Sequence, residues 1–171
     1  MHKKWIYLFI SLATLGLDQI TKEMVNQALF LHESRSIIPG FFNLVHTRNS
    51  GAVFGVFQDS TSALLPKLLL MLSFVALGLV AFYFHKSPAT ERLNLMGLSL
   101  IMGGAVGNII DRLARSSVVD FLEFYVGSFH WPAFNVADSA ICVGISFLLL
   151  RAFRDREDPA EASQSPARLH S

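Results

Sequence analysis

Four long apolar stretches constrain this sequence more than any other feature. A helix needs about 20 mostly apolar residues to span the hydrocarbon core of a membrane. Charged residues make up only 16% of the chain, whereas a soluble domain contains about 25%. This composition excludes a water-soluble enzyme and a disordered chain. We therefore predict an all-α membrane protein, a bundle of four transmembrane helices over about residues 5–22, 64–85, 93–112 and 136–153.

The first stretch has two interpretations. Its uninterrupted apolar run, residues 5–17, follows a basic flank at residues 2–4, as in the core of a secretory signal peptide. No small-x-small cleavage site follows, because the chain continues with the polar Asp18. We therefore expect an uncleaved helix.

The long segment between the first two spans contains a β-pattern. Residues 41–48 have the β-branched and aromatic content of a strand. A turn signal follows at residues 49–51, and residues 52–57 resume the apolar pattern. We expect a small β-sheet outside the membrane, in a β-region over about 41–57.

The remaining segments complete the expected organisation. The connection 114–135 contains Trp131 and Pro132, which we interpret as an interfacial anchor and a helix-start signal. Residues 1–154 are expected to form one integral-membrane domain. Residues 155–171 form a polar tail rich in Ala, Ser and Pro, which we expect to be disordered.

Basic residues near the span ends predict the orientation, because cytoplasmic segments carry an excess of Lys and Arg. Such residues gather before the first span, in the short turn 86–92 and after the fourth span. We therefore expect both termini in the cytoplasm. The cytoplasmic basic residues are then Lys3, Lys4, Lys86, Arg92, Arg151, Arg154, Arg156 and Arg168.

Four aspartates, Asp18, Asp111, Asp120 and Asp138, are expected at one level, the outer membrane boundary. Charge inside a membrane is costly and by default marks a functional site. Two carboxyl groups within about 3 Å cannot both ionise easily and share one proton. One of them then activates a water molecule while the protonated one polarises a carbonyl group, as in an aspartic protease.

Other chemistries have little support in the sequence. The single cysteine, Cys142, excludes a disulfide framework and a cysteine-based zinc site, and we expect its thiol to be buried as a packing group. The six histidines are scattered without metal-binding spacing, so we predict no metal and no cofactor. No serine sits one turn from Lys22 or Lys67 at a helix start, which argues against a Ser–Lys dyad. A net charge of +1 excludes a nucleic-acid binder.

Five sequence blocks, in their order and spacing, resemble the bacterial lipoprotein signal peptidases (signal peptidase II). The likeness extends from about residue 5 to residue 153. The blocks are Asp18-Gln-Ile-Thr-Lys22, Asn49-Ser-Gly51-Ala-Val-Phe54-Gly55, Gly103-Gly104-Ala-Val-Gly107-Asn108-Ile-Ile-Asp111-Arg112, Val119-Asp120-Phe121 and Phe134-Asn135-Val-Ala137-Asp138-Ser139.

The resemblance implies an aspartic endopeptidase of the bacterial inner membrane, with its active site on the periplasmic side. Such an enzyme removes signal peptides from diacylglyceryl-modified prolipoproteins and cuts just before the lipidated cysteine. It also implies a four-helix membrane bundle with a small β-sheet cradle, and membrane lipid as a partner. Asp120 and Asp138 correspond to the catalytic pair. Binding and support positions correspond to Asn49, Gly51, Asn108, Arg112 and Asn135.

Both catalytic candidates also have structural interpretations. Asp138 opens the fourth span, where an Asp usually serves as a helix cap. Asp120 could be an ordinary loop carboxylate, although an isolated Asp between Val119 and Phe121 is a poor loop residue. We favour catalysis for both.

The neighbouring polar positions suggest support rather than chemistry. Asp18 lies four residues before Lys22, a favourable spacing for a structural ion pair. Asp111 and Arg112 could form an adjacent pair that anchors a helix end, with Arg112 placed to hold a lipid phosphate or a substrate carbonyl. Gly104 is expected to let two helices approach closely.

Two other classes of protein compete with a peptidase. A small polytopic transporter or proton-relay subunit could use intramembrane aspartates, but it would need charges across the full depth of the membrane. A passive scaffold would have no use for four aspartates at one level. We therefore favour the peptidase.

Overall fold

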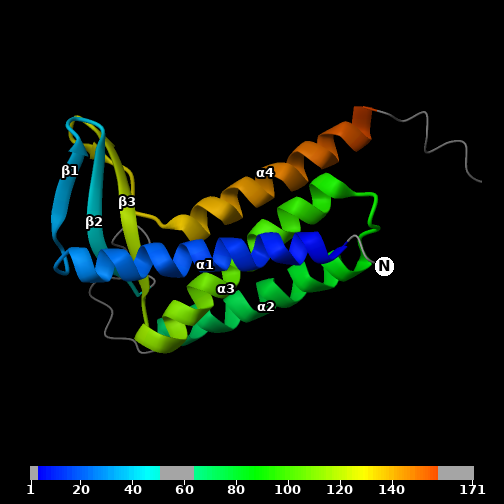
Figure 1. The fold of residues 1–171 in the computed structure, drawn as a ribbon, viewed down its shortest axis with the longest axis horizontal. Coiled ribbons are helices and arrows are strands. Elements are labelled where there is room, and N and C mark those ends of the chain that lie inside the picture. Colours follow the sequence, from blue (N-terminus) through cyan, green and yellow to red (C-terminus); the bar gives the residue numbers. More distant parts are fainter. Residues whose placement is uncertain (1–3, 51–63, 158–171) are drawn as a thin grey trace, which may run out of the picture.

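The computed structural model describes residues 4–50 and 64–157. Four helices run alongside one another, and a small antiparallel sheet lies at one end of them (Figure 1). The helices are α1 (Trp5–Ala28), α2 (Leu64–Lys86), α3 (Arg92–Arg115) and α4 (Val136–Glu157). The strands are β1 (Ser34–Ile38), β2 (Phe42–Asn49), β3 (Val118–Val126) and β4 (Phe129–His130).

Three helices of the described chain are long and apolar enough to cross a membrane, namely Pro66–Lys86, Arg92–Arg115 and Val136–Arg154. Their limits agree closely with the spans expected from the sequence. The chain is therefore a membrane protein with several spans and a small sheet. The sheet means that the fold is not purely helical, as the expected β-region already indicated.

Helix α1 continues to Ala28, well beyond the expected end at residue 22. Val25 and Leu29 pack against Phe121 of β3 in a buried apolar cluster, so the sheet stabilises the extra helical turns.

The sheet has the order β1-β2-β3-β4, and each neighbouring pair is antiparallel. Gly40 lies between β1 and β2 with φ of +81°, a conformation that other residues rarely adopt. The expected strand at 41–48 is confirmed as β2, whose partners are β1 and β3. The second half of the expected β-region, residues 52–57, lies outside the described residues.

The most consequential difference from expectation is β3. Within the expected connection 114–135, residues 118–126 form a strand that pairs with β2. In this pairing Asp120 lies opposite Thr47. The strand carries one of the two expected catalytic residues into the sheet.

Helix α3 packs closely against α1 and α4 because glycines replace side chains at the crossings. A Cβ atom at Gly104 would lie 2.5 Å from the backbone oxygen of Ala137, and one at Gly97 would lie 2.7 Å from that of Gly144. The expected role of Gly104 in close helix approach is confirmed. Such contacts suit a membrane, where van der Waals packing drives helix association.

Two smaller expectations need correction. Cys142 is exposed on the surface of α4, so its thiol is not a buried packing group. Helix α4 also continues to Glu157, slightly beyond the expected domain limit at residue 154. The rest of the expected tail lies outside the described residues.

Candidate active site

The structure brings all four expected aspartates into one hydrogen-bonded network at the sheet end of the helices. Asp18 comes from α1, Asp111 from α3, Asp120 from β3 and Asp138 from the first turn of α4. The first three are buried, and Asp138 is partly exposed. Segments far apart in the sequence thus converge on one site.

One half of this network consists of ion pairs. The ammonium group of Lys22 lies 2.8 Å from Asp18 Oδ2 and 2.9 Å from Asp111 Oδ2, and all three side chains are fully buried. Arg115 Nη1 lies 2.7 Å from Asp111 Oδ1. The expected Asp18–Lys22 pair is therefore confirmed and is part of a larger cluster.

Asp111 and Arg112, adjacent in the sequence near the end of α3, form no ion pair with each other in the described part of the chain. Residues i and i+1 on a helix do not face each other, whereas residues i and i+4 do. Asp111 therefore pairs with Arg115. Arg112 donates a long bond of 3.4 Å to the Asn108 carbonyl and forms no ion pair within the described residues, although Asp138 and Asp120 act on its charge.

The other half of the network is built from amides. Asn135 Nδ2 donates to Asp120 Oδ1 at 2.7 Å, and Asn49 Nδ2 donates to Asp120 Oδ2 at 3.1 Å. Thr47 Oγ1 donates to the backbone oxygen of Asp120 at 3.1 Å, which holds β3 against β2. Asp120 is thus fixed by its own strand and by two side-chain amides.

Asp138 is held by a reciprocal cap at the start of α4. Its backbone N–H donates to Asn135 Oδ1 at 2.9 Å, and its Oδ2 accepts from the backbone N–H of Asn135 at 3.2 Å. This arrangement satisfies two backbone donors at the helix start. Its other oxygen, Oδ1, accepts from Asn108 Nδ2 at 2.8 Å. Asp138 is therefore a helix cap that also presents a carboxyl oxygen to the site.

Asn135 is the bridge between the two carboxyl groups. Among the described residues, no hydrogen bond joins the side chains of Asp120 and Asp138 directly. The side chain of Asn135 contacts both residues instead. A single buried residue thus sets the relation between them.

The surroundings of Asp120 favour its protonated form. Burial raises the pKa of Asp120 to about 7, with a further contribution from the charge of Asp138. Hydrogen bonds from Asn49 and Asn135 and the charge of Lys22 act in the opposite direction. Near neutral pH the Asp120 carboxyl group can therefore donate or accept a proton.

Two further candidates from the sequence are Asn108 and Gly51. Asn108 is buried and contacts both Lys22 and Asp138, so it belongs to the network. Gly51 lies outside the described residues. Over residues 4–50 and 64–157 no group of three His, Cys, Asp or Glu side chains could hold a metal ion.

Two partners of the aspartates were not expected from the sequence, namely Thr47 at the backbone of Asp120 and Arg115 in the ion pair with Asp111. Arg115 could have been found from its spacing of four residues after Asp111. Thr47 depends on the register between β2 and β3, for which the sequence offers no local signal.

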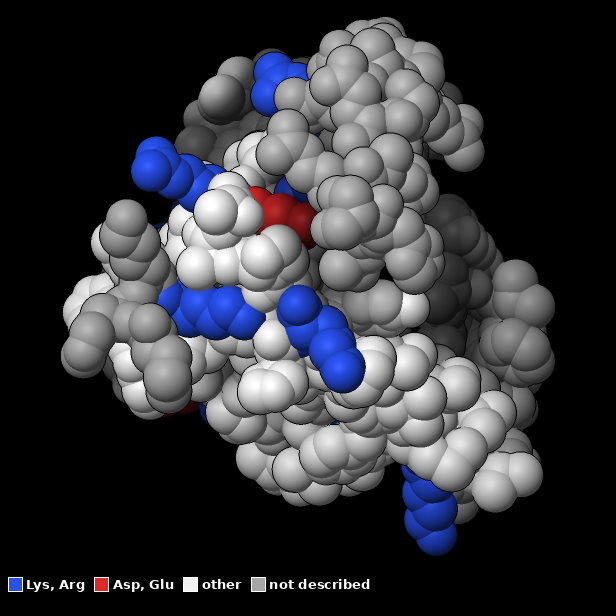
Figure 2. Space-filling model, turned by 90° about the vertical axis from the view of Figure 1, so that its right-hand side faces the viewer, with Lys and Arg blue, Asp and Glu red and all other residues white. Residues whose placement is uncertain are grey.

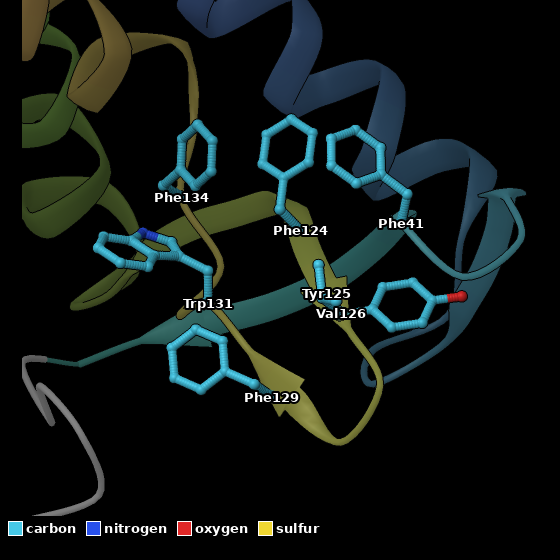
Figure 3. Close-up of a pocket in the computed structure, with 7 residues that line it drawn as sticks. All are labelled: Phe41, Phe124, Tyr125, Val126, Phe129, Trp131 and Phe134. Atoms are coloured by element: carbon cyan, nitrogen blue, oxygen red, sulfur yellow. The ribbon is translucent and has the colours of Figure 1, made fainter.

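An apolar surface adjoins the polar site. A cavity of about 370 Å³ lies on the sheet and on the segment that leads into α4, and its walls are largely aromatic (Figure 3). Phe134 in its wall directly precedes Asn135, and Trp131 is 58% exposed there. The lining residues are Phe41, Phe124, Tyr125, Val126, Phe129, Trp131 and Phe134.

Comparison with known proteins identifies close relatives along most of the chain. A relative from Maridesulfovibrio salexigens named lipoprotein signal peptidase is 39% identical and covers 91% of this chain and 100% of its own length. A relative of the same name from Syntrophotalea carbinolica is 43% identical and covers 88% of this chain and 92% of its own length.

Solved structures agree with this fold. A bacterial membrane enzyme solved by the in meso method superposes with a TM-score of 0.76 at 26% identity, over 88% of this chain and 94% of the other. A second, at 24% identity, superposes with a TM-score of 0.78 over 95% and 94% of the two chains and supports the fold alone. The model of the family described as signal peptidase (SPase) II matches residues 10–154, which contain every residue of the network, and the chain therefore belongs to the signal peptidase II family.

Proposed function

We propose that this protein is an aspartic endopeptidase that removes signal peptides from diacylglyceryl-modified prolipoproteins, with Asp120 and Asp138 as its catalytic pair. Family membership supports proteolysis and lipoprotein precursors as substrates. The observation that carries the aspartic mechanism is the bridge made by Asn135, which holds the two carboxyl groups at one site.

The pair has the properties that general acid and base catalysis requires. With a pKa of about 7, Asp120 retains a proton near neutral pH. Both carboxyl oxygens of Asp138 accept hydrogen bonds, from Asn108 and from the Asn135 backbone, which orients this carboxyl group for the role of a base. We therefore assign Asp120 as the initial acid and Asp138 as the initial base.

The reaction then proceeds through a tetrahedral intermediate. Asp138 takes a proton from a water molecule, whose oxygen bonds to the scissile carbonyl carbon, while Asp120 gives its proton to the carbonyl oxygen. The intermediate collapses when one of its hydroxyl groups returns a proton to Asp120. The carbon–nitrogen bond breaks as Asp138 passes its proton to the leaving nitrogen, which restores both residues.

Neighbouring groups suit a lipid-anchored substrate. The aromatic cavity beside Asn135 offers an apolar surface next to the scissile bond. The guanidinium group of Arg112 has donors available for a lipid phosphate or a substrate carbonyl. Asn49 is placed to support Asp120, and we propose Gly51 as a substrate-binding position on the family resemblance alone.

We also propose α1 as a fourth span. Its 24 residues extend about 36 Å at the rise of an α-helix. Its charged residues Asp18 and Lys22 are buried inside the protein, while apolar side chains point outward. Up to Lys22 the outward side of this helix is therefore mainly apolar, and the exposed polar residues Glu23 and Gln27 lie beyond that point. The exposed apolar residues are Trp5, Ile6, Phe9, Leu12, Leu17, Ile20 and Met24.

The proposed location is the inner membrane, with both termini in the cytoplasm and the site on the periplasmic side. The described chain begins and ends at the end of the helices opposite the sheet (Figure 1). Basic side chains gather on this end face (Figure 2). Lys4 Nζ donates to the His85 carbonyl at 2.9 Å, which joins the start of α1 to the end of α2. Excess positive charge is typical of the cytoplasmic side.

Topology can be tested with reporters. A reporter fused after Arg154 and another inserted in 86–92 should both report a cytoplasmic position. An external reporter at either place would put the aspartates on the wrong face of the membrane and contradict the proposed location.

The proposed function is tested by cleavage of a lipid-modified precursor in detergent. The wild-type chain should cut before the lipidated cysteine, and EDTA should leave the rate unchanged. Because Cys142 lies on the outer surface of α4, the variant Cys142→Ala should cleave as fast as the wild type. Serine-directed reagents should not inhibit cleavage, because the proposed mechanism uses no serine nucleophile. Loss of activity with EDTA that zinc restores would refute the aspartic mechanism. The transporter alternative has no support in the comparisons.

A further inference from the structure

Lys22 makes one contact that charge balance does not require. Its ammonium group carries three protons, and it has three acceptors: Asp18 Oδ2, Asp111 Oδ2 and Asn108 Oδ1 at 3.0 Å. The two carboxylates, together with Arg115 on Asp111, already pair the buried charges. The third proton goes to a neutral amide.

This third contact determines which way the Asn108 amide points. An ammonium group can only donate, so the atom of Asn108 that faces Lys22 must be the oxygen. The amide nitrogen then faces Asp138 and donates to Oδ1 at 2.8 Å. Asn135 Nδ2 also donates to the same Asn108 oxygen at 3.3 Å. Rotating the amide by half a turn would set donors against donors at two contacts and remove the donor from Asp138.

Asn135 does not depend on Lys22 in this way. Its side-chain oxygen accepts from the backbone N–H of Asp138, so the helix start itself fixes its orientation. Asn108 has no such backbone bond to its side chain within the described residues. Its orientation therefore relies on Lys22, with Asn135 as a weaker second donor.

We propose that Lys22 is a positioning residue for catalysis, which locks the Asn108 amide so that its nitrogen always donates to Asp138. This inference rests on the proposed function. It assigns Lys22 a role beyond the ion pair with Asp18, because the effect on catalysis passes through Asn108.

The first test is Lys22→Met, which keeps the length of the side chain and removes its donors. The expected result is a fall in kcat of roughly a hundredfold, the scale of a small misplacement of reacting groups, with KM unchanged. Activity is measured per mole of folded, detergent-extracted protein with a lipid-modified precursor. A kcat equal to that of the wild type would overturn the proposal.

A double-mutant cycle separates positioning from stability. If Lys22 acts through Asn108, Lys22→Met should lower kcat no further in a chain that already carries Asn108→Ala. Losses in kcat that multiply in the double variant would overturn the proposal. The matched control is Arg115→Met, which removes the other cation from Asp111 but touches no amide of the site. This control should lower stability and leave kcat per folded mole unchanged.

A second variant keeps the test informative if Lys22→Met fails to fold. Combining Lys22→Met with Asp18→Asn removes one charge of each sign and leaves Asp111 paired with Arg115. This double variant should fold and show the same loss of kcat, whereas full kcat would overturn the proposal. Absence of cleavage by the wild-type chain would instead refute the proposed function, which keeps the two failures distinct.

Discussion

The network contains two pairs of aspartates whose surroundings differ. Asp18 and Asp111 both contact the ammonium group of Lys22 at less than 3 Å. Asp120 and Asp138 accept hydrogen bonds from neutral amides, and neither forms an ion pair with another described residue. Both pairs lie at the same end of the helices, and Asn108 connects them.

The difference shows how one site can separate structure from chemistry. A buried ion pair fixes the charge of both partners, and removing one partner leaves an uncompensated charge. Amides orient a carboxyl group without supplying a compensating charge. Asp120 can therefore change its protonation near neutral pH, as its raised pKa indicates. The ion-paired aspartates support the fold that holds the other two.

The largest expected effect comes from neutralising the amide-held pair. Asp120→Asn and Asp138→Asn keep the size of the side chain and remove its ability to exchange a proton. Each should reduce cleavage by about a thousandfold or more, as for a member of a catalytic triad. The amount of folded protein should stay near normal. The measurement is precursor cleavage per mole of folded protein. Near-normal turnover in either variant would show that Asp120 and Asp138 are not the catalytic pair, and Asp18 and Asp111 would then be the candidates.

A smaller effect, on stability, is expected at the ion-paired aspartates. Asp111→Asn leaves Lys22 and Arg115 without a shared carboxylate and should destabilise the fold by about 3–5 kcal/mol. The matched control is Glu23→Gln, which removes only an exposed partner of Arg115 at 3.4 Å and should cost at most about 1 kcal/mol. Thermal unfolding in detergent measures both. Equal stability of the two variants would show that the buried pair is not the stronger support.

The smallest expected effect is a pH dependence carried by Asp120. Its pKa of about 7 means that the acid form is lost as pH rises through neutrality. Cleavage should therefore fall between about pH 6 and about pH 8. Because the folded-state pKa is raised from 3.8 to about 7, folding stability should also fall as pH rises from about 4 to about 7, and Asp120→Asn should remove this loss. A rate that is constant across neutrality would argue against Asp120 as the acid.

The membrane spans could be predicted from the sequence because lipid requires a long, continuous run of mostly apolar residues. Each span shows its apolar composition within its own residues, and the level of the four aspartates follows from counting along them. Helix α1 was the exception at its C-terminal end. There Val25 and Leu29 pack against Phe121, a residue distant in the sequence, and packing of this kind leaves no local pattern in the sequence of the helix.

The sheet and the bonds of the site were harder to predict because they join distant segments. β3 becomes a strand through its pairing with β2, more than 60 residues earlier in the chain. The sequence indicated Asp120 and Asp138 but not that the side chain of Asn135 would make hydrogen bonds to both of them. Such a bridge depends on where α4 begins relative to β3, which only the folded chain defines.

The most direct test of the two-pair account is infrared spectroscopy of the carboxyl groups during a pH titration, with cleavage measured in parallel. A protonated carboxyl group has a carbonyl stretch that an ionised one lacks. We predict that the wild-type chain loses this band in step with activity as pH rises through about 7, the pKa of Asp120. Between about pH 6 and about pH 7, where ordinary carboxyl groups are ionised, Asp120→Asn should lack the band and Asp18→Asn should retain it. A band that disappears with Asp18→Asn and persists in Asp120→Asn would contradict the account.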